Sequence, residues 1–336
     1  MTASSELQIG ETSRGNDRLR ISFAIPVYQN EGALRLTHAA IRDLFVGGPL
    51  SGYDYEIVFT NDGSTDGSLA ELKAIAGEDN RIVVLSLTRN FGQMAAMMAG
   101  FHHATGDAVV NISADMQDPL DLVVSMVEHW RNGTDLVIGY RQAREDSLRA
   151  RLWSKLAYSL LRLSVPELPQ GGFDYCLMSR RVMDAFNAIP ARNRFFQGDL
   201  LLLGFATRFL PYVRRKRTIG RSQYTFWKKF RNLTDALVDS SYLPIRIMSA
   251  IGIVTAVLGF IYGITVVIAW LAGRTPEGWA AIMILILVLC GMIMAMLGVI
   301  GEYVWRIADE VRGKPVYVVD ERFGKVSGPS RGPASE

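Results

Sequence analysis

The sequence predicts an α/β domain, built on a mostly parallel sheet with flanking helices, that is followed by a two-helix transmembrane hairpin. Short runs rich in Val and Ile alternate with longer amphipathic stretches between residues 21 and 213 of the 336-residue chain. Such strand–helix alternation is typical of a parallel sheet with helices on its faces. Two later stretches carry no charge at all, one of 27 residues between Arg246 and Arg274 and one of 24 between Glu277 and Glu302.

The strands of the domain are expected where Val and Ile run almost without interruption, as in strands covered on both faces. These runs lie at 21–27, 55–60, 81–86, 108–112 and 135–139. The intervening helices are expected at 31–45, 66–76, 92–104 and 120–132. Because ligands of such sheets bind beyond the carboxyl ends of the strands, the residues just after each strand are the candidate site.

The two uncharged stretches each exceed the roughly 20 residues that cross a hydrocarbon core of about 30 Å. They predict spans at about 247–271 and 279–301. The alternative is a pair of buried core helices in a soluble domain, which rarely run this long without charge. The sequence therefore divides into five parts. They are a disordered tail (1–18), the α/β domain (19–213), a basic segment with an amphipathic juxtamembrane helix (214–244), the hairpin (245–303) and a C-terminal tail (304–336).

Positive charge brackets the predicted hairpin. Residues 214–231 hold eight Lys and Arg and no acid, and Arg306, Arg312 and Lys314 follow the second span. The positive-inside rule then places the domain and both termini in the cytoplasm, at the inner or plasma membrane, with only the connecting turn outside. The basic segment could also hold anionic lipid headgroups. Nucleic-acid binding is disfavoured, because the net charge of the chain is only +3.

Three polar clusters follow predicted strands. They are PVYQNE at 26–31, NDGSTD at 61–66 and SADMQDP at 113–119. The carboxylate and amide oxygens of the third suit a hard divalent cation, Mg²⁺ or Mn²⁺, that also holds substrate phosphates. Each cluster also has an alternative without a ligand. The first would then be a helix entry and the second a plain turn, while Asp118 in the third would cap the next helix.

Further motifs carry a resemblance to a known family. They are TRNFGQ at 88–93, AGFHHATGD at 99–107, DMQDP at 115–119, RTIGRSQY at 217–224, GEYVWR at 301–306 and KPVY at 314–317. With these motifs the chain resembles the family-2 glycosyltransferases of GT-A fold. Within them it is similar to the polyprenyl-phosphate hexose transferases, including bactoprenol glucosyltransferase-like and dolichyl-phosphate mannose synthase-like enzymes.

The resemblance implies a membrane-anchored, inverting glycosyltransferase that moves one hexose from a nucleotide sugar to polyprenyl phosphate. Glucose from UDP-glucose is the first choice, and GDP-mannose or a UDP-N-acetyl-hexosamine donor is the alternative. It implies a divalent cation, Mg²⁺ or Mn²⁺, as cofactor. The partners it implies are the nucleotide sugar, the polyprenyl phosphate lipid and the membrane, with no nucleic acid.

The resemblance also assigns roles by position. The donor would be bound by Pro26, Tyr28, Glu31, Asp62 and Asp115. The metal would be held by Asp115 and Gln117. The acceptor phosphate would be bound by Arg217, Ser222, Arg141, Arg149 and Ser154. Asp174 would be the base or the group that orients the acceptor, and together with Asp115 it is the expected catalytic pair.

Three residues depart from the family pattern. Ser113 stands where an Asp-x-Asp motif usually begins, Asn61 replaces an Asp, and Cys176 stands where many relatives have Arg. Ser113 and Cys176 leave a non-enzyme alternative open, a degenerate scaffold at the membrane. A processive polysaccharide synthase is disfavoured because its Gln-x-x-Arg-Trp pattern does not occur. Small residues in the first span, such as Gly259, let helices approach, so a homo-oligomer is a further hypothesis.

Overall fold

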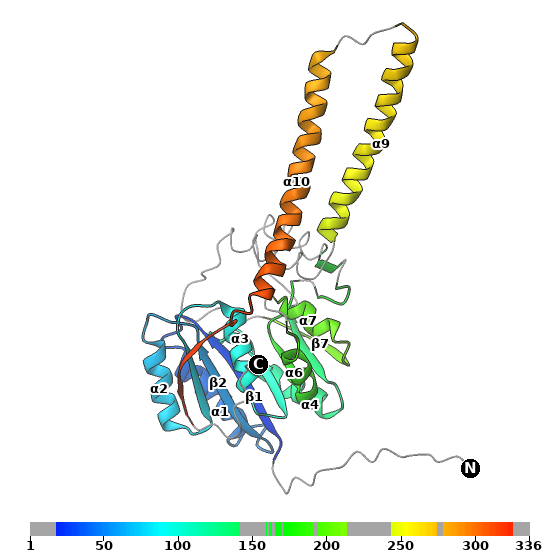
Figure 1. The fold of residues 1–336 in the computed structure, drawn as a ribbon. Helices are drawn as coiled ribbons and strands as arrows, with labels where there is room; N and C mark the ends of the chain where they lie inside the picture. The colour runs from blue at the N-terminus through cyan, green and yellow to red at the C-terminus, as the bar shows by residue number, and fades with distance from the viewer. Residues whose placement is uncertain are drawn as a thin grey trace, which may run out of the picture.

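The protein consists of an α/β domain from which two long helices rise (Figure 1). This computed structural model describes residues 18–141, 159, 161–162, 165–169, 171–190, 194–213, 243–273 and 278–324. The basic stretch 214–231 and the helix expected after it therefore lie outside the described residues.

The domain is organised around an eight-stranded sheet with the strand order β7-β5-β6-β4-β1-β2-β3-β8. The strands are β1 (Arg20–Val27), β2 (Asp54–Asn61), β3 (Ile82–Leu87), β4 (Ala108–Asn111), β5 (Leu136–Arg141), β6 (Cys176–Ser179), β7 (Thr207–Tyr212) and β8 (Val319–Phe323). Neighbouring strands are parallel except where β6 pairs with β4 and β5, and where β8 pairs with β3. The prediction of a mostly parallel sheet is confirmed.

Helices cover both faces of this sheet. One face packs against α1 (Leu34–Phe45), α2 (Ser68–Glu78) and α4 (Asp121–Arg131), and the other against α3 (Gln93–His103), α6 (Arg180–Asn187) and α7 (Phe196–Leu202). Alternation along the strands explains the two cores, since successive side chains point to opposite faces. On β1, for example, Phe23 and Ile25 enter the first core and Ala24 the second.

The five strands and four helices expected in the α/β domain between residues 21 and 139 are present with bounds shifted by at most a few residues. The strands β6, β7 and β8 and the helices α6 and α7 were not predicted. Each is short, and β6 and β8 run against the direction of their neighbours. Such short elements lack the repeated strand–helix pattern on which the prediction depended.

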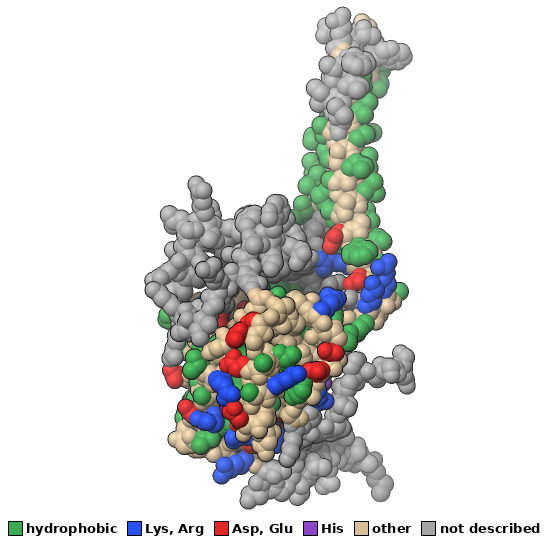
Figure 2. All heavy atoms as spheres, turned by 90° about the vertical axis from the view of Figure 1, so that its left-hand side faces the viewer, with side chains coloured by type: hydrophobic (Ala, Val, Ile, Leu, Met, Phe, Trp, Pro, Cys, Tyr) green, Lys and Arg blue, Asp and Glu red, His purple; other side chains and the backbone are tan. Residues whose placement is uncertain are grey.

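The two long helices are α9 (Leu243–Leu271) and α10 (Trp279–Val311). By length and composition, Ile247–Ala269 and Val288–Val311 could each cross a membrane, and neither segment is buried by the rest of the protein. The first agrees with the predicted span at 247–271, whereas the second lies about ten residues later than the predicted span at 279–301, because α10 continues to Val311. Side chains such as Phe260, 71% exposed, and Leu271, 72% exposed, therefore face outward. On the face shown in Figure 2, hydrophobic side chains line the described part of the hairpin, and charged ones lie on the domain and at the hairpin base. Two buried core helices, the soluble alternative, are thus excluded.

After α10 the chain returns to the domain and adds β8 to the edge of the sheet (Figure 1). The carbonyl of Val318 accepts a hydrogen bond from the amide of Thr88, which directly follows β3 (3.1 Å). The Tyr317 hydroxyl lies 2.9 Å from Nδ1 of His102 on α3. The base of α10 is thereby held near the carboxyl ends of the parallel strands. β8 lies in the segment expected as a C-terminal tail, and the predicted domain boundaries stay a prediction.

Candidate functional site

The loops after β1 and β2 are joined by reciprocal hydrogen bonds. The amide of Glu31 donates to Asp66 (3.2 Å), and the Glu31 carboxylate accepts from the amide of Gly67 (2.9 Å). A Cβ at Gly67 would meet that carboxylate, so a larger residue there would displace the Glu31 side chain. Asp66 also accepts from the amide of Ser68, the first residue of α2, as expected of a residue at a helix start (3.1 Å). Tyr28, the first residue after β1, is 36% exposed.

Asp62 follows β2 and holds the loop after β3. Its two carboxylate oxygens accept hydrogen bonds from the backbone amides of Phe91 (2.7 Å) and Gly92 (3.0 Å). Gly63, with φ of +64°, lets this turn lie directly against the backbone of the loop after β3. Burial raises the pKa of Asp62, and the two amides partly offset that effect. The Asp62 carboxylate therefore fixes the loop after β3 against the loop after β2.

The loop after β4 brings two carboxylates together around one hydroxyl. The Ser113 Oγ lies 2.9 Å from Oδ1 of Asp115 and 2.5 Å from Oδ2 of Asp118. Both acids are nearly buried, with 5% and 6% of their surface exposed. The backbone amide of Gln117 donates a hydrogen bond to the Asp115 carboxylate (3.2 Å). The N-cap position of α4 is Leu120, and the bonds described for Asp118 come from Ser113 and Tyr212.

Two residues of the site adopt a backbone conformation that non-glycine residues rarely take. Gln29 in the loop after β1 has φ of +55°, and Met116 in the loop after β4 has φ of +56°. They are the non-glycine residues with positive φ among those the structure describes. Such conformations cost about 1–3 kcal/mol each and persist where the surroundings hold them, often at functional sites. Both occur at the carboxyl edge of the sheet, and Met116 lies within the loop 113–118 that carries Asp115 and Asp118, called the acidic loop below.

The predicted acceptor side is represented by Asp174 and Arg141. Asp174 precedes β6, and its side chain is 56% exposed, 4.0 Å from a guanidinium nitrogen of Arg141 at the end of β5. The side-chain amide of Asn111, at the end of β4, donates to the Asp174 carbonyl (2.5 Å). Asn111 is 2% exposed, and its Oδ1 has no hydrogen-bond partner among the described residues. Asp174 is thus anchored by its backbone while its carboxylate faces outward.

Tyr212 connects the acidic loop with Arg141. Its hydroxyl donates to Oδ1 of Asp118 (3.0 Å) and accepts from Nε of Arg141 (3.4 Å). The ring of Tyr175 packs edge-on against it, with centroids 5.6 Å apart, and donates its own hydroxyl to the Pro119 carbonyl (2.9 Å). Burial, reinforced by the Asp118 charge, raises the pKa of Tyr212 to about 12. The phenol therefore stays protonated at neutral pH.

The structure places Pro26, Tyr28, Glu31, Asp62, Asp115, Gln117, Arg141 and Asp174 after or at the ends of β1, β2, β4, β5 and before β6. These strands form a continuous part of the sheet, so the predicted donor, metal and acceptor residues that are described share its carboxyl edge. Arg149, Ser154, Arg217 and Ser222 lie outside the described residues. Cys176 is fully buried in the second core, so its side chain makes no acceptor contact.

Sequence reasoning missed Asn111 and Tyr212. Asn111 was visible as an amide within the apolar run AVVN, where a buried polar side chain needs a partner. Tyr212 lies in TRFLPY, a strand that the sequence did not reveal, so its position at the sheet edge could not be foreseen.

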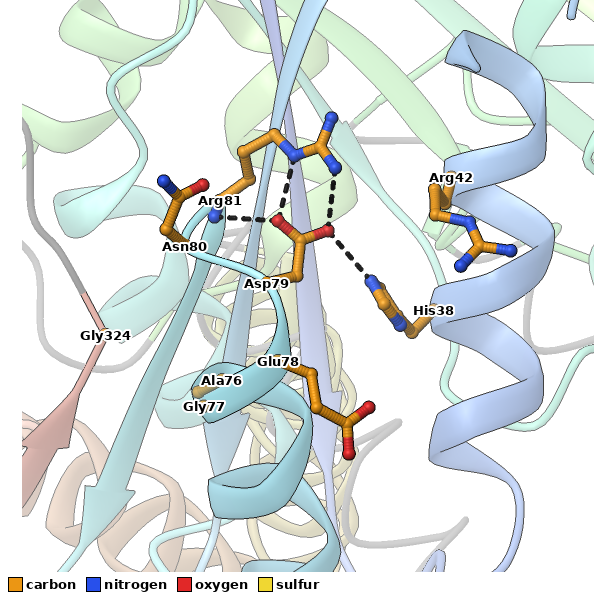
Figure 3. A pocket seen from close by; sticks show the side chains of 9 residues that line it. All are labelled: His38, Arg42, Ala76, Gly77, Glu78, Asp79, Asn80, Arg81 and Gly324. Carbon is orange, nitrogen blue, oxygen red and sulfur yellow. Dashed lines mark hydrogen bonds and ion pairs between the residues drawn. The ribbon is translucent and has the colours of Figure 1, made fainter. Parts of the chain in front are cut away.

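A cavity of about 650 Å³ lies at the opposite, amino end of the strands (Figure 3). Asp79 lies at its centre and accepts hydrogen bonds from Arg81 (2.9 Å) and the Tyr55 hydroxyl (3.1 Å), with the His38 ring 3.2 Å away. Hydrogen bonds from Arg81 and His38 outweigh burial and lower the pKa of Asp79. Because Arg81 directly precedes β3, this cavity is separate from the carboxyl-edge site.

Comparisons with known proteins agree on one family. Residues 22–185 match the model of glycosyl transferase family 2. The chain is 35% identical over 304 residues to the SfII prophage-derived bactoprenol glucosyl transferase of Shigella flexneri, a match that covers 90% of this chain and 97% of that relative. It is 34% identical over 304 residues to the prophage bactoprenol glucosyl transferase homolog of Escherichia coli, covering 90% and 98%.

Among solved structures, the chain is similar to glucosyl-3-phosphoglycerate synthase from Mycobacterium tuberculosis, crystallised with Mn²⁺ and uridine-diphosphate-glucose. The TM-score is 0.45 at 22% identity, and the match covers 64% of this chain and 75% of that one. This is a distant likeness.

Proposed function

The chain belongs to glycosyl transferase family 2 and is a glycosyltransferase, and we propose that it transfers one glucose from a nucleotide sugar to polyprenyl phosphate. The observation that carries this proposal is the extent of the match to the bactoprenol glucosyl transferases. A match over 304 residues is longer than the α/β domain and must include the long helices as well. The catalytic domain and its membrane anchor are therefore shared together.

The position of the site supports a lipid acceptor. The base of α10 is held near the carboxyl end of β3 by the contact between Thr88 and Val318. The acidic loop after β4 lies at the same edge of the sheet. A soluble nucleotide sugar can reach this edge from water, while a lipid phosphate can reach it from the bilayer surface that the hairpin defines.

We assign the donor to the loops after β1, β2 and β4. Tyr28 and Glu31 would line the nucleotide pocket beside Pro26, which lies past the part of β1 that pairs with β4. Its missing N–H therefore costs no hydrogen bond to β4. Asp62 would shape the pocket through its bonds to the loop after β3, and its carboxylate would lie near the base or ribose.

A divalent cation, Mg²⁺ or Mn²⁺, fits the residues of the acidic loop. Asp115 supplies a carboxylate and Gln117 an amide oxygen, which are hard ligands. The described residues contain no group of three His, Cys, Asp or Glu that could hold a metal by themselves. This donor set suits an ion that the protein shares with the diphosphate of the substrate. When bound, the cation would neutralise the charge on the leaving diphosphate.

The acceptor side needs positive charge more than a strong base. A phosphate monoester has a second pKa of about 6, so it is largely dianionic and already nucleophilic at neutral pH. Arg141 would bind this phosphate, since arginine is always charged and can form two parallel bonds to phosphate oxygens. Asp174, 4.0 Å away, would orient Arg141 and the acceptor. Arg149, Ser154, Arg217 and Ser222 are assigned to the acceptor by sequence alone.

We infer that the α/β domain and both termini are cytoplasmic. The basic residues of 214–231, together with Arg306 near the end of α10 and Arg312 directly after it, support this orientation. A reporter enzyme that is active only outside the cytoplasm should be active when inserted in the turn at 272–278. The same reporter should be inactive at the C-terminus.

The experiment is a donor screen with the full chain in detergent and Mn²⁺ or Mg²⁺. Radiolabelled UDP-glucose and undecaprenyl phosphate should yield a labelled lipid, and omission of the lipid phosphate or addition of EDTA should abolish it. GDP-mannose and UDP-N-acetylglucosamine are tested in parallel. If the lipid is labelled from one of these donors and not from UDP-glucose, the transferred sugar is mannose or N-acetylglucosamine, not glucose. No labelled lipid with any donor would refute transfer to polyprenyl phosphate.

A further inference from the structure

A chain of contacts crosses the site from the acidic loop to the acceptor side. It starts at Asp115, which lies 2.9 Å from the Ser113 hydroxyl, and continues through Ser113 to Asp118 (2.5 Å). Tyr212 then bonds Asp118 (3.0 Å) and Arg141 (3.4 Å). The Ser113 hydroxyl has one hydrogen, so it donates to one of the two carboxylates at a time, and Asp118 also accepts from the Ser113 backbone amide (3.3 Å).

Tyr212 is the point at which the two halves meet. Arg141 and Tyr212 are directly paired in the parallel register of β5 and β7, and each is the last residue of its strand. A phenol hydroxyl has one hydrogen to donate and can also accept. Here it donates to Asp118 and accepts from Arg141, so both capacities are used.

The surroundings leave this hydroxyl little freedom. Tyr212 is 6% exposed, and its ring packs in the first core against Tyr175. A tyrosine ring that is fixed in this way carries its hydroxyl as a rigid spacer. The distance between the acidic loop and the Arg141 guanidinium is therefore determined by one side chain that itself projects from the sheet.

We propose that Tyr212 is a positioning residue that holds the donor-side loop and the acceptor-side arginine at the separation needed for transfer. This inference rests on the proposed function. Tyr212 acts through Asp118 and Arg141 and need not touch either substrate. Loss of the Tyr212 hydroxyl should therefore slow transfer within the complex of both substrates, while the affinity for each substrate changes little.

The test compares Tyr212→Phe with Tyr175→Phe. Both variants remove one buried hydroxyl from adjacent rings, but the Tyr175 hydroxyl bonds only the Pro119 carbonyl in the described contacts (2.9 Å). Tyr212→Phe should lower kcat about 10-fold or more, because small misplacements of reacting groups are costly. In Tyr212→Phe the KM for each substrate should change by less than about 3-fold. Tyr175→Phe should lower kcat by less than about 3-fold, and the Tm of the two variants should be similar.

A double-mutant cycle separates positioning from packing. In an Arg141→Ala background, Tyr212→Phe should cost little further activity, because the contact that it adjusts is already gone. Equal losses in the two phenylalanine variants, or full additivity with Arg141→Ala, would overturn the inference. A raised KM with unchanged kcat would also overturn it, since Tyr212 would then be a binding residue.

Failure of the proposed function is visible separately. If the wild-type protein transfers no sugar to polyprenyl phosphate, the positioning role is tested by hydrogen–deuterium exchange. Tyr212→Phe should then speed exchange in peptides that cover 113–118, where the amides of Ser113 and Gln117 donate to Asp118 and Asp115. Unchanged exchange would overturn the inference, whatever the substrate.

Discussion

The two ends of the central sheet both carry buried carboxylates, but they hold them in different ways. At the amino end, Asp79 is hydrogen-bonded by the guanidinium of Arg81 and by neighbours from α1 and β2. At the carboxyl end, the hydrogen bonds that the structure describes for Asp115 come from a hydroxyl and a backbone amide. The charge-assisted bonds from Arg81 make Asp79 a stabilising residue, whereas we assign the charge of Asp115 to the cation and the donor.

This contrast predicts the largest effect at Asp115. Asp115→Asn keeps the size of the side chain and removes the negative charge that we assign to the cation and the donor. Transfer of labelled glucose to lipid should fall by roughly 100-fold or more, since metal-assisted charge stabilisation contributes several kcal/mol. Tm should change by no more than about 3 °C, because the same neutral donors remain in place.

The matched control for that variant is Asp79→Asn, measured in the same transfer assay. The folded Asp79 variant should keep wild-type activity. A scaffold without catalysis would instead retain its cellular phenotype with Asp115→Asn, and equal activity losses at both positions would contradict the contrast between the two ends.

Asp79→Asn should itself be the more destabilising of the two changes. It removes the charge that strengthens the hydrogen bonds from Arg81, and it replaces Oδ2, which bonds His38 and Tyr55, or Oδ1 by an amide nitrogen that cannot accept. The free energy of unfolding should fall by about 2 kcal/mol. For a domain of this size that corresponds to a decrease in Tm of about 5 °C, which thermal unfolding followed by circular dichroism would measure. An unchanged Tm would show that the amino-end network contributes little.

The same residue predicts a pH dependence. The pKa of Asp79 is lower in the folded protein than its ordinary value, because hydrogen bonds from Arg81 and His38 outweigh the effect of burial. Its stabilising contribution is therefore complete above the unfolded pKa of about 4 and is lost as the pH falls below it. The Tm difference between wild type and Asp79→Asn should shrink between about pH 5 and pH 3. A constant difference would mean that the carboxylate charge is not what stabilises the cavity.

The sequence predicted the strands of the central α/β pattern because Val-rich and Ile-rich runs recur between amphipathic helices. It also located the loops at the carboxyl edge, since Asp62 and Asp115 directly follow such runs. It could not show that Asp62 bonds the loop after β3, because that contact depends on the order of the strands. Tyr212 was hidden for a similar reason, since β7 pairs with a strand more than 60 positions away in the chain.

The smallest effect concerns the strained backbone at Met116. With φ of +56°, this residue should accept Asn, whose short polar side chain tolerates the left-handed region, better than β-branched Val. Met116→Val should therefore be less stable than Met116→Asn by about 1 kcal/mol, or roughly 3 °C in Tm. Transfer activity should fall further in the Val variant, since the loop also carries Asp115 and Gln117. If the two variants have the same Tm and activity, the acidic loop does not depend on this conformation, and its strain has no part in the difference between the two ends of the sheet.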